Sequence, residues 1–191
     1  VEGYTSLWHN DFADGMCLKA IQLVMDYLPR AYEQGSNDPE ARERMHNAAT
    51  IAGLGFGNSM AAMAHAMGHS LGALFPIPHG RAVGLFLPYT IEFTARGDAP
   101  TRYGQLARFL GLPAGDTAAG VASLSKAIRD LARRIDQPTS LQEAGISLRD
   151  FETKLPQLVE NSANDSALVV STRFPSEEEI ERVLRYAFEG K

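Results

Sequence analysis

The sequence predicts an all-α protein, a helical bundle-like domain that extends over residues 1–191. Apolar residues recur at helical spacing in successive segments, and most of these segments have their own start or stop signal. Only Leu168 to Ser171 has the composition of a strand, and the chain contains no repeat, linker or low-complexity tract. Its 191 residues are enough for one domain with a sizeable core and too few for two domains of ordinary size.

Two helices are predicted in the first quarter of the chain. The apolar spacing predicts a helix from Phe12 to Leu28, and Pro29 should end it. The next start signal contains Asp38, which can cap a helix, and Pro39, which suits the first helical position. That helix should continue from Ala41 to Ile51.

The middle of the chain should hold two largely buried helices. Three glycines at positions 53, 55 and 57 should first break or thin the preceding helix. Ser59 to Leu71 is rich in Ala, Met and Gly, which allows close approach of neighbouring backbones, and Gly72 can end it. Arg81 to Phe93 is predicted to form a further apolar helix with a kink at Pro88.

Four more helices are predicted in the C-terminal half, and each begins with a cap signal. They are Asp98 to Gly111, Asp116 to Ile135, Ser147 to Glu160, and a last helix that opens with the capping box Ser176 to Glu179 and finishes in Arg185 and Lys191. Acidic residues in the first turn of the last helix interact favourably with the positive, N-terminal end of the helix dipole.

Composition and charge exclude several classes of protein. Apolar residues make up 45% and charged residues 21% of the chain, which is ordinary for a globular protein. The net charge is -5 and basic residues do not cluster with aromatic ones, so we expect no nucleic-acid partner. No apolar run is long enough to cross a bilayer, and the first residues lack the pattern of a signal peptide. We therefore expect no membrane partner.

The single cysteine, Cys17, excludes an internal disulfide. It fits a reducing compartment such as the cytoplasm, and we expect it to be a small buried residue on a helix face. The chain begins with Val1 rather than methionine, so Val1 need not be the start of the gene product.

Three of the five histidines gather in one short glycine-rich segment: His65, His69 and His79. In a helix over residues 59–71, His65 and His69 lie one turn apart on the same face. Neutral imidazoles suit a first-row transition metal, and two ligands one turn apart can face one ion. Ala66 stands where an HExxH metalloprotease has its glutamate, so hydrolysis is disfavoured. The alternative is that these are core histidines hydrogen-bonded to backbone carbonyls.

Other candidate residues have simpler interpretations. The run of residues 53–57, GLGFG, follows a helix and lacks the full GxGxxG spacing, so it is not a dinucleotide-binding fingerprint. Its glycines suit tight packing between helices, and Phe56 is either a core residue or an apolar wall of the site. We expect His9 and His46 at the surface, and Trp8 as an anchoring core aromatic.

The run from His65 to Gly80, HAMGHSLGALFPIPHG, resembles the signature of the iron-containing (group III) alcohol dehydrogenases. The closing segment, Ser171 to Ile180, is similar to the family's last helix and its approach, so the resemblance covers essentially the whole chain. These enzymes have an N-terminal dinucleotide-binding domain of α/β type and an all-helical domain that holds a divalent metal, commonly Fe(II). The resemblance implies that residues 1–191 are the helical metal and substrate domain, and that the dinucleotide-binding domain is absent from this chain.

The resemblance also implies roles for individual residues. In the family an aspartate, a histidine one turn later and two further histidines hold the metal, and the last two match His65 and His79. His69 matches the histidine beside the substrate and the nicotinamide, whereas spacing alone favours His65 and His69 as joint ligands. Phe56 would shape the wall near the nicotinamide, with plain packing as the alternative. The first two ligands normally stand just ahead of an (I/V)-E-G-Y segment, which begins here at Val1. We therefore expect them upstream, and weak or absent metal binding by this chain alone.

The function that the resemblance implies is hydride transfer between a small alcohol or aldehyde and NAD(P) in the intact protein. A divalent metal, Fe²⁺ or alternatively Zn²⁺, would act as a Lewis acid, and His69 would relay a proton between the substrate oxygen and solvent. One alternative is a metal-independent relative such as a maleylacetate reductase. Another is a non-catalytic helical module that binds metal or joins subunits. The sequence leaves open the alcohol, the choice of NAD or NADP, the metal, and whether the chain forms a homo-oligomer.

Overall fold

No β-strand is present in the computed structural model, which describes residues 1–191, so the all-α prediction is confirmed. The elements, which include two short 3₁₀ turns (η1 and η2), are α1 (Glu2–Thr5), α2 (Asp11–Gln34), η1 (Gly35–Asn37), α3 (Pro39–Ser59), α4 (Met63–Leu74), α5 (His79–Ala95), α6 (Tyr103–Phe109), α7 (Thr117–Arg134), α8 (Leu148–Ala163), η2 (Ser166–Val170) and α9 (Glu177–Glu189). None of the helices is long and apolar enough to span a bilayer.

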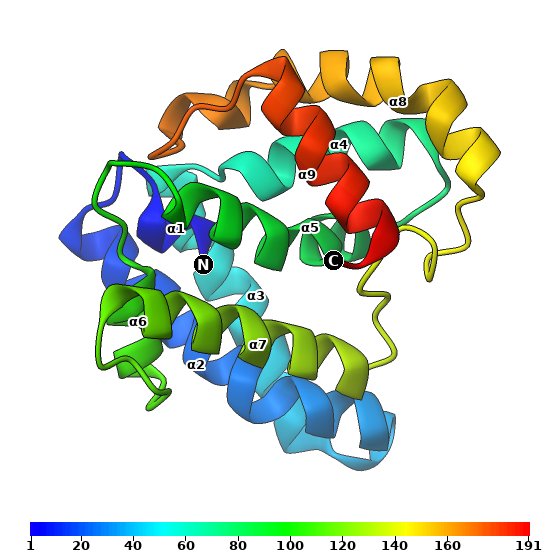
Figure 1. Cartoon of the computed structure of the whole chain (residues 1–191). Coiled ribbons are helices and arrows are strands. Elements are labelled where there is room, and N and C mark those ends of the chain that lie inside the picture. The colour runs from blue at the N-terminus through cyan, green and yellow to red at the C-terminus, as the bar shows by residue number, and fades with distance from the viewer.

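Helix α5 runs through the middle of the molecule (Figure 1). On one side of it lie α4, α8 and α9, which share with α5 a core of 23 buried residues that includes Phe86, Phe151 and Leu158. On the other side lie α6, α7 and the α2–α3 hairpin, where a second core of eight buried residues includes Ile91 and Leu124. Helix α5 contributes buried residues to both cores. This packing along the helix holds His79, its first residue, in place.

The structure corrects the predicted ends of the first two long helices. Helix α2 does not end at Pro29 but continues to Gln34, and α3 continues through its three glycines to Ser59. Proline and glycine weaken a helix, but the packing of α2 against α3 outweighs that cost here. A Cβ at Gly55 would lie 2.8 Å from the Sγ atom of Cys17, which is buried as predicted. This glycine therefore allows the two helices to approach closely.

The ends of α4 also differ from the prediction. The helix expected from residue 59 begins only at Met63, because α3 continues to Ser59. The residue that follows α3, Met60, has a φ of 63°, which is uncommon for a residue other than glycine. Helix α4 then passes through Gly72 and ends at Leu74. The next residue, Phe75, is extended, as expected for a residue that precedes a proline.

From α5 onward, the predictions agree more closely with the structure. Helix α5 contains Pro88 as expected, but it begins at His79 rather than at Arg81. Helix α6 begins at Tyr103, so Asp98 does not open it as predicted. The segment with strand-like composition lies largely in the 3₁₀ turn η2. The other three predicted caps are present, and their side chains accept N–H groups in the first turns of α7, α8 and α9: Asp116, Ser147 and Ser176.

The capping box of α9 gives a pH-dependent prediction. The side chain of Glu179 accepts the N–H of Ser176, which is the main cause that lowers the pKa of Glu179, and Arg173 lowers it further. A carboxylate with a lowered folded pKa stabilises the fold above its unfolded pKa and loses that contribution as the pH falls through the folded pKa. We expect Glu179→Gln to cost about 0.3–1 kcal/mol in the free energy of unfolding near neutral pH.

Urea unfolding of wild type and Glu179→Gln at about pH 7 and about pH 3 checks this expectation. The two proteins should differ at the higher pH and converge at the lower one. An equal difference at both pH values would show that the carboxylate charge does not stabilise α9.

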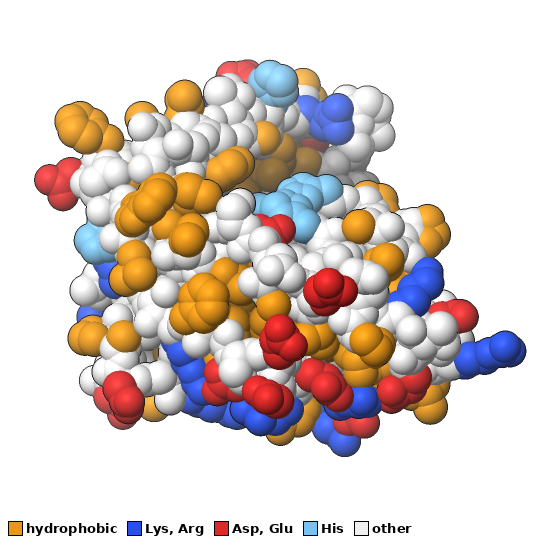
Figure 2. Space-filling model, turned by 90° about the horizontal axis from the view of Figure 1, so that it is seen from above, with side chains coloured by type: hydrophobic (Ala, Val, Ile, Leu, Met, Phe, Trp, Pro, Cys, Tyr) orange, Lys and Arg blue, Asp and Glu red, His pale blue; other side chains and the backbone are white.

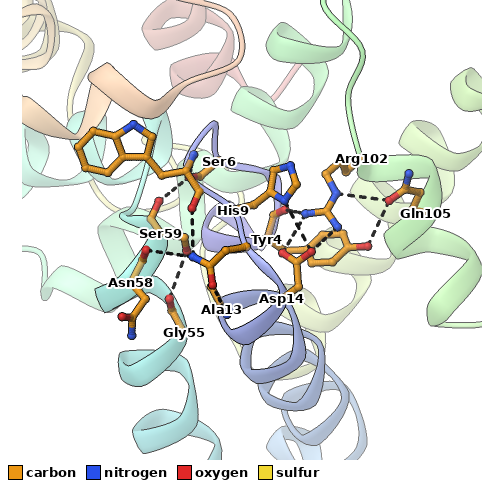
Figure 3. A network of polar contacts seen from close by, with 12 residues as sticks. Tyr4, Ser6, His9, Ala13, Asp14, Gly55, Asn58, Ser59, Arg102 and Gln105 are labelled. Atoms are coloured by element: carbon orange, nitrogen blue, oxygen red, sulfur yellow. Dashed lines mark hydrogen bonds and ion pairs between the residues drawn. The ribbon is translucent and has the colours of Figure 1, made fainter.

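A polar network holds α1 against its neighbours (Figure 3). Arg102 donates to the two carboxylate oxygens of Asp14, at 2.9 and 2.5 Å, and to the carbonyl oxygen of Tyr4 at 2.6 Å. Its guanidinium also lies 3.8 Å from the centre of the Tyr4 ring. The hydroxyl of Ser6 donates to the carbonyl oxygen of Ser59 at the end of α3. These contacts fix the short α1 between α2, α3 and the start of α6.

The connection from α1 to α2 runs over the surface and exposes apolar side chains. Trp8 is 56% exposed, so its prediction as an anchoring core aromatic is wrong. Leu7 beside it and Phe12 at the start of α2 are also exposed, so several apolar side chains of this surface are not buried against any other part of the chain. His9 and His46 are exposed, as predicted.

Candidate metal centre

Three imidazole rings meet where α4 and α5 lie side by side. His65 and His69 are one turn apart in α4, and His79 is the first residue of α5. The ring centres of His65 and His69 are 5.8 Å apart, those of His65 and His79 are 5.5 Å apart, and those of His69 and His79 are 5.3 Å apart. The structure therefore brings all three predicted histidines together. Figure 2 shows a group of histidine side chains at the edge of a hollow, with hydrophobic side chains around it.

A glycine allows this arrangement. Gly68 lies between the two histidines of α4, and a Cβ there would lie 2.6 Å from Cγ2 of Val83 and 2.9 Å from its Cα. Real side chains do not tolerate such distances to a neighbouring backbone. The absence of a side chain at Gly68 thus lets the backbones of α4 and α5 touch, and it sets the distance between the histidines of the two helices.

Glu2 in α1 orients His65. One carboxylate oxygen of Glu2 accepts the N–H of Ala64 at 2.6 Å, and the other contacts Nδ1 of His65. The Glu2 side chain is only 10% exposed. Because an ionised carboxylate can only accept, this contact requires the proton on Nδ1, and in the neutral ring the lone pair is then on Nε2. Nε2 is the nitrogen that His65 can offer to a metal ion.

Asp165 makes the equivalent contact to His69. Its Oδ2 lies 2.8 Å from Nδ1 of His69, and its Oδ1 accepts the N–H of Ala167 at 2.8 Å as the cap of η2. Sequence reasoning did not find Glu2 or Asp165 as site residues, because they lie 63 and 96 positions from their histidines. Of the two, only Glu2 lies in a sequence motif, the (I/V)-E-G-Y segment that this chain shares with the family it resembles.

His79 has no hydrogen-bond partner in the structure, in contrast to the other two rings. Partial burial lowers its pKa first, and the neighbouring His65 and His69 lower it further. His79 is therefore neutral near pH 7, which is the protonation state that a metal ligand needs.

The separations of the rings fit ligands of a common ion. An imidazole nitrogen binds a divalent metal at about 2.1 Å, so two bound rings have their centres about 4.6 Å apart at a right angle and about 5.6 Å apart at 120°. The 5.5 Å between His65 and His79 and the 5.3 Å between His69 and His79 both lie in this range, so the ring separations alone do not choose between the two pairs. No group of three His, Cys, Asp or Glu side chains in this chain is arranged to hold a metal ion by itself.

Phe56 stands next to this cluster at the C-terminal end of α3. Its ring centre lies 6.1 Å from that of His65, and its side chain is 44% exposed. Phe56 is therefore not a core residue.

An apolar groove of about 350 Å³ extends from the cluster between α2, α3, α5 and α7. We call it the α2–α7 groove. Glu2 and His65 are its polar side chains, and 15 of its 18 lining residues are hydrophobic. Val1 is also one of its lining residues.

The fold and this site together define an all-helical domain with a histidine-rich candidate metal centre. Residues 1–188 match the family model described as Fe-containing alcohol dehydrogenase family, C-terminal. The chain belongs to the iron-containing alcohol dehydrogenase family.

Known proteins are similar to this chain in sequence and in structure. The bifunctional aldehyde-alcohol dehydrogenase AdhE of Escherichia coli is 36% identical over 207 residues, which cover 100% of this chain and 23% of AdhE. The NADPH-dependent butanol dehydrogenase of Clostridium saccharobutylicum is 31% identical over 100% of this chain and 48% of the relative. The iron-containing alcohol dehydrogenase of Thermococcus thioreducens superimposes with a TM-score of 0.88 at 32% identity, over 100% of this chain and 47% of that one. The chain thus spans half or less of the length of these relatives.

Proposed function

We propose that the protein to which this chain belongs transfers hydride between a small alcohol or aldehyde and the nicotinamide of NAD(P), with a divalent metal at the histidine cluster. The membership of the family supports this reaction class. The observation that carries it to particular residues is the meeting of the imidazoles of His65, His69 and His79, with ring centres 5.3–5.8 Å apart. The match of His65 and His79 to the ligand positions of the family selects these two for the metal. When bound, the metal supplies Lewis acidity toward the substrate oxygen.

In this proposal His65 and His79 hold the ion. Glu2 keeps a proton of His65 on Nδ1, so Nε2 would be the nitrogen that binds the metal. His79 is neutral without a carboxylate partner, because its surroundings lower its pKa. Fe²⁺ is our first assignment and Zn²⁺ the alternative, since imidazole ligands accept both.

Further ligands are proposed to come from a helical segment ahead of Val1. The α2–α7 groove supports this, because it is apolar, begins at Val1 and follows one face of α2 and of α7. A helix in this groove would place its last turn beside His65.

His69 and Phe56 are assigned to the substrate side of the site. His69 is 46% exposed, so its Nε2 can exchange a proton between the substrate oxygen and solvent. Phe56 offers a partly exposed apolar face next to His65, which suits the wall of a nicotinamide pocket. The dinucleotide itself would be held mainly by an N-terminal domain outside this chain.

Metal removal tests the proposed function. The full-length protein should oxidise small primary alcohols with NAD⁺ or NADP⁺, lose this activity after dialysis against a chelator, and regain it with Fe²⁺ or Zn²⁺. Activity that survives complete removal of metal, verified by elemental analysis, would instead indicate a metal-independent reductase. Absence of any NAD(P)-linked activity in the metal-loaded protein would reject the dehydrogenase proposal.

A further inference from the structure

We propose that Asp165 is a positioning residue for His69, which it holds as the Nδ1–H tautomer with Nε2 free toward the substrate. This inference rests on the proposed function for the role of His69, but not for the tautomer itself. The observation behind it is the 2.8 Å contact between Oδ2 of Asp165 and Nδ1 of His69.

The carboxylate belongs to a rigid part of the fold. Its second oxygen accepts the N–H of Ala167, which fixes the side chain at the start of η2. Turn η2 packs against α4, and its residues Ala167, Leu168 and Val170 are buried. Asp165 is therefore anchored to the same core that carries His69.

The two partners differ in their exposure to solvent. The side chain of His69 is 46% exposed, whereas that of Asp165 is 17% exposed. Without a partner, an imidazole this exposed would turn about its side-chain bonds and exchange tautomers with water. No Lys or Arg pairs with Asp165, so His69 is the one cationic or proton-donating side chain that its Oδ2 contacts.

This geometry decides which nitrogen can react. An ionised carboxylate accepts and does not donate, so Nδ1 must carry the proton. In the neutral ring the remaining nitrogen, Nε2, then has a lone pair and can accept a proton from a substrate hydroxyl. The same logic applies to the buried Glu2 and His65, so two carboxylates from distant parts of the chain set the tautomers of the two histidines of α4.

Asp165→Asn separates positioning from structural support. Asparagine also caps helical turns well, so the amide oxygen can keep the N–H of Ala167. The amide NH₂ group then faces Nδ1 of His69. Since this group only donates, His69 must accept at Nδ1 and carry its proton on Nε2. The variant should fold normally and hold His69 as the opposite tautomer.

The test is ¹⁵N NMR of the histidine rings in the full-length, metal-free protein labelled with ¹⁵N-histidine, without substrate. Signals of His69 are identified by their loss in His69→Gln. We expect a protonated Nδ1 and an unprotonated Nε2 in wild type, and the reverse in Asp165→Asn. In the metal-loaded enzyme kcat should fall by about 10- to 100-fold, with KM and metal content nearly unchanged.

Asp116→Asn is the matched control. Asp116 caps α7 through the N–H of Ala119, as Asp165 caps η2, but it contacts no histidine. This variant should leave the His69 tautomer and kcat unchanged.

Two results would overturn the inference: an Nε2–H tautomer of His69 in wild type, or the same tautomer in wild type and Asp165→Asn. Because the tautomer is read without metal or substrate, a failure of the proposed dehydrogenase activity leaves this test intact. Conversely, an active enzyme with an unaltered tautomer in the variant would reject only the role of Asp165.

Discussion

His79→Ala is expected to remove bound metal and turnover together from the full-length protein. His79 is neutral, has no other hydrogen-bond partner and faces His65 across 5.5 Å, so in the proposed site its nitrogen serves the ion alone. Loss of a partner that merely orients a ligand costs about 10- to 100-fold in metal affinity, and loss of the ligand itself should cost more. Elemental analysis after gel filtration and an NAD(P)-linked rate assay measure the two effects.

His69→Ala is the matched comparison, since it removes an imidazole whose centre lies only 5.3 Å from that of His79. It should keep the metal and slow turnover by about 10²- to 10⁴-fold. Unchanged metal content and rate in His79→Ala would refute its assignment. Loss of the ion in His69→Ala would make His69 a ligand, as the spacing of His65 and His69 alone suggests.

The second large effect is expected for Gly68→Ala, which should destabilise the fold and disperse the histidine cluster. A Cβ at this position would lie 2.9 Å from the backbone of Val83, so α4 and α5 would have to move apart. Overpacking of this kind typically costs about 1–3 kcal/mol, which exceeds the gain of about 1 kcal/mol from replacing a helical glycine. Because His65 and His79 lie on opposite sides of this contact, metal content should fall as well.

Gly72→Ala, one turn further along α4, provides the control. Its Cβ would meet only the carbonyl oxygen of Ile77, at an ordinary 3.5 Å. We expect Gly72→Ala to be neutral or slightly stabilising, with full metal content. Urea unfolding and elemental analysis of both variants measure the contrast. Equal stability of the two variants would show that the close approach at Gly68 does not hold the site together.

Local signals in the sequence predicted the class of fold and most helix starts. Asp116, Ser147 and Ser176 cap their helices as expected, because a cap depends on a side chain and an amide only three residues away. The continuation of α2 through Pro29 and of α3 through its glycines was not predictable in this way. There the packing between two helices overrides the propensity of single residues.

In the candidate site, too, local features could be predicted from the sequence and long-range contacts could not. Helical spacing predicts that His65 and His69 share a face, and their ring centres are 5.8 Å apart. That His79 reaches the same place depends on the packing of α5 and on the close contact at Gly68, which no local pattern encodes. The partners of the rings, Glu2 and Asp165, lie in distant segments and required the folded chain.

The most direct test of the metal centre is a crystal structure of the full-length, metal-loaded protein with anomalous data at the absorption edge of the ion. We predict one anomalous peak within about 2.0–2.3 Å of Nε2 of His65 and of a ring nitrogen of His79, with His69 outside bonding distance. A peak elsewhere in the molecule, or one bound by His69 in place of His79, would contradict this arrangement.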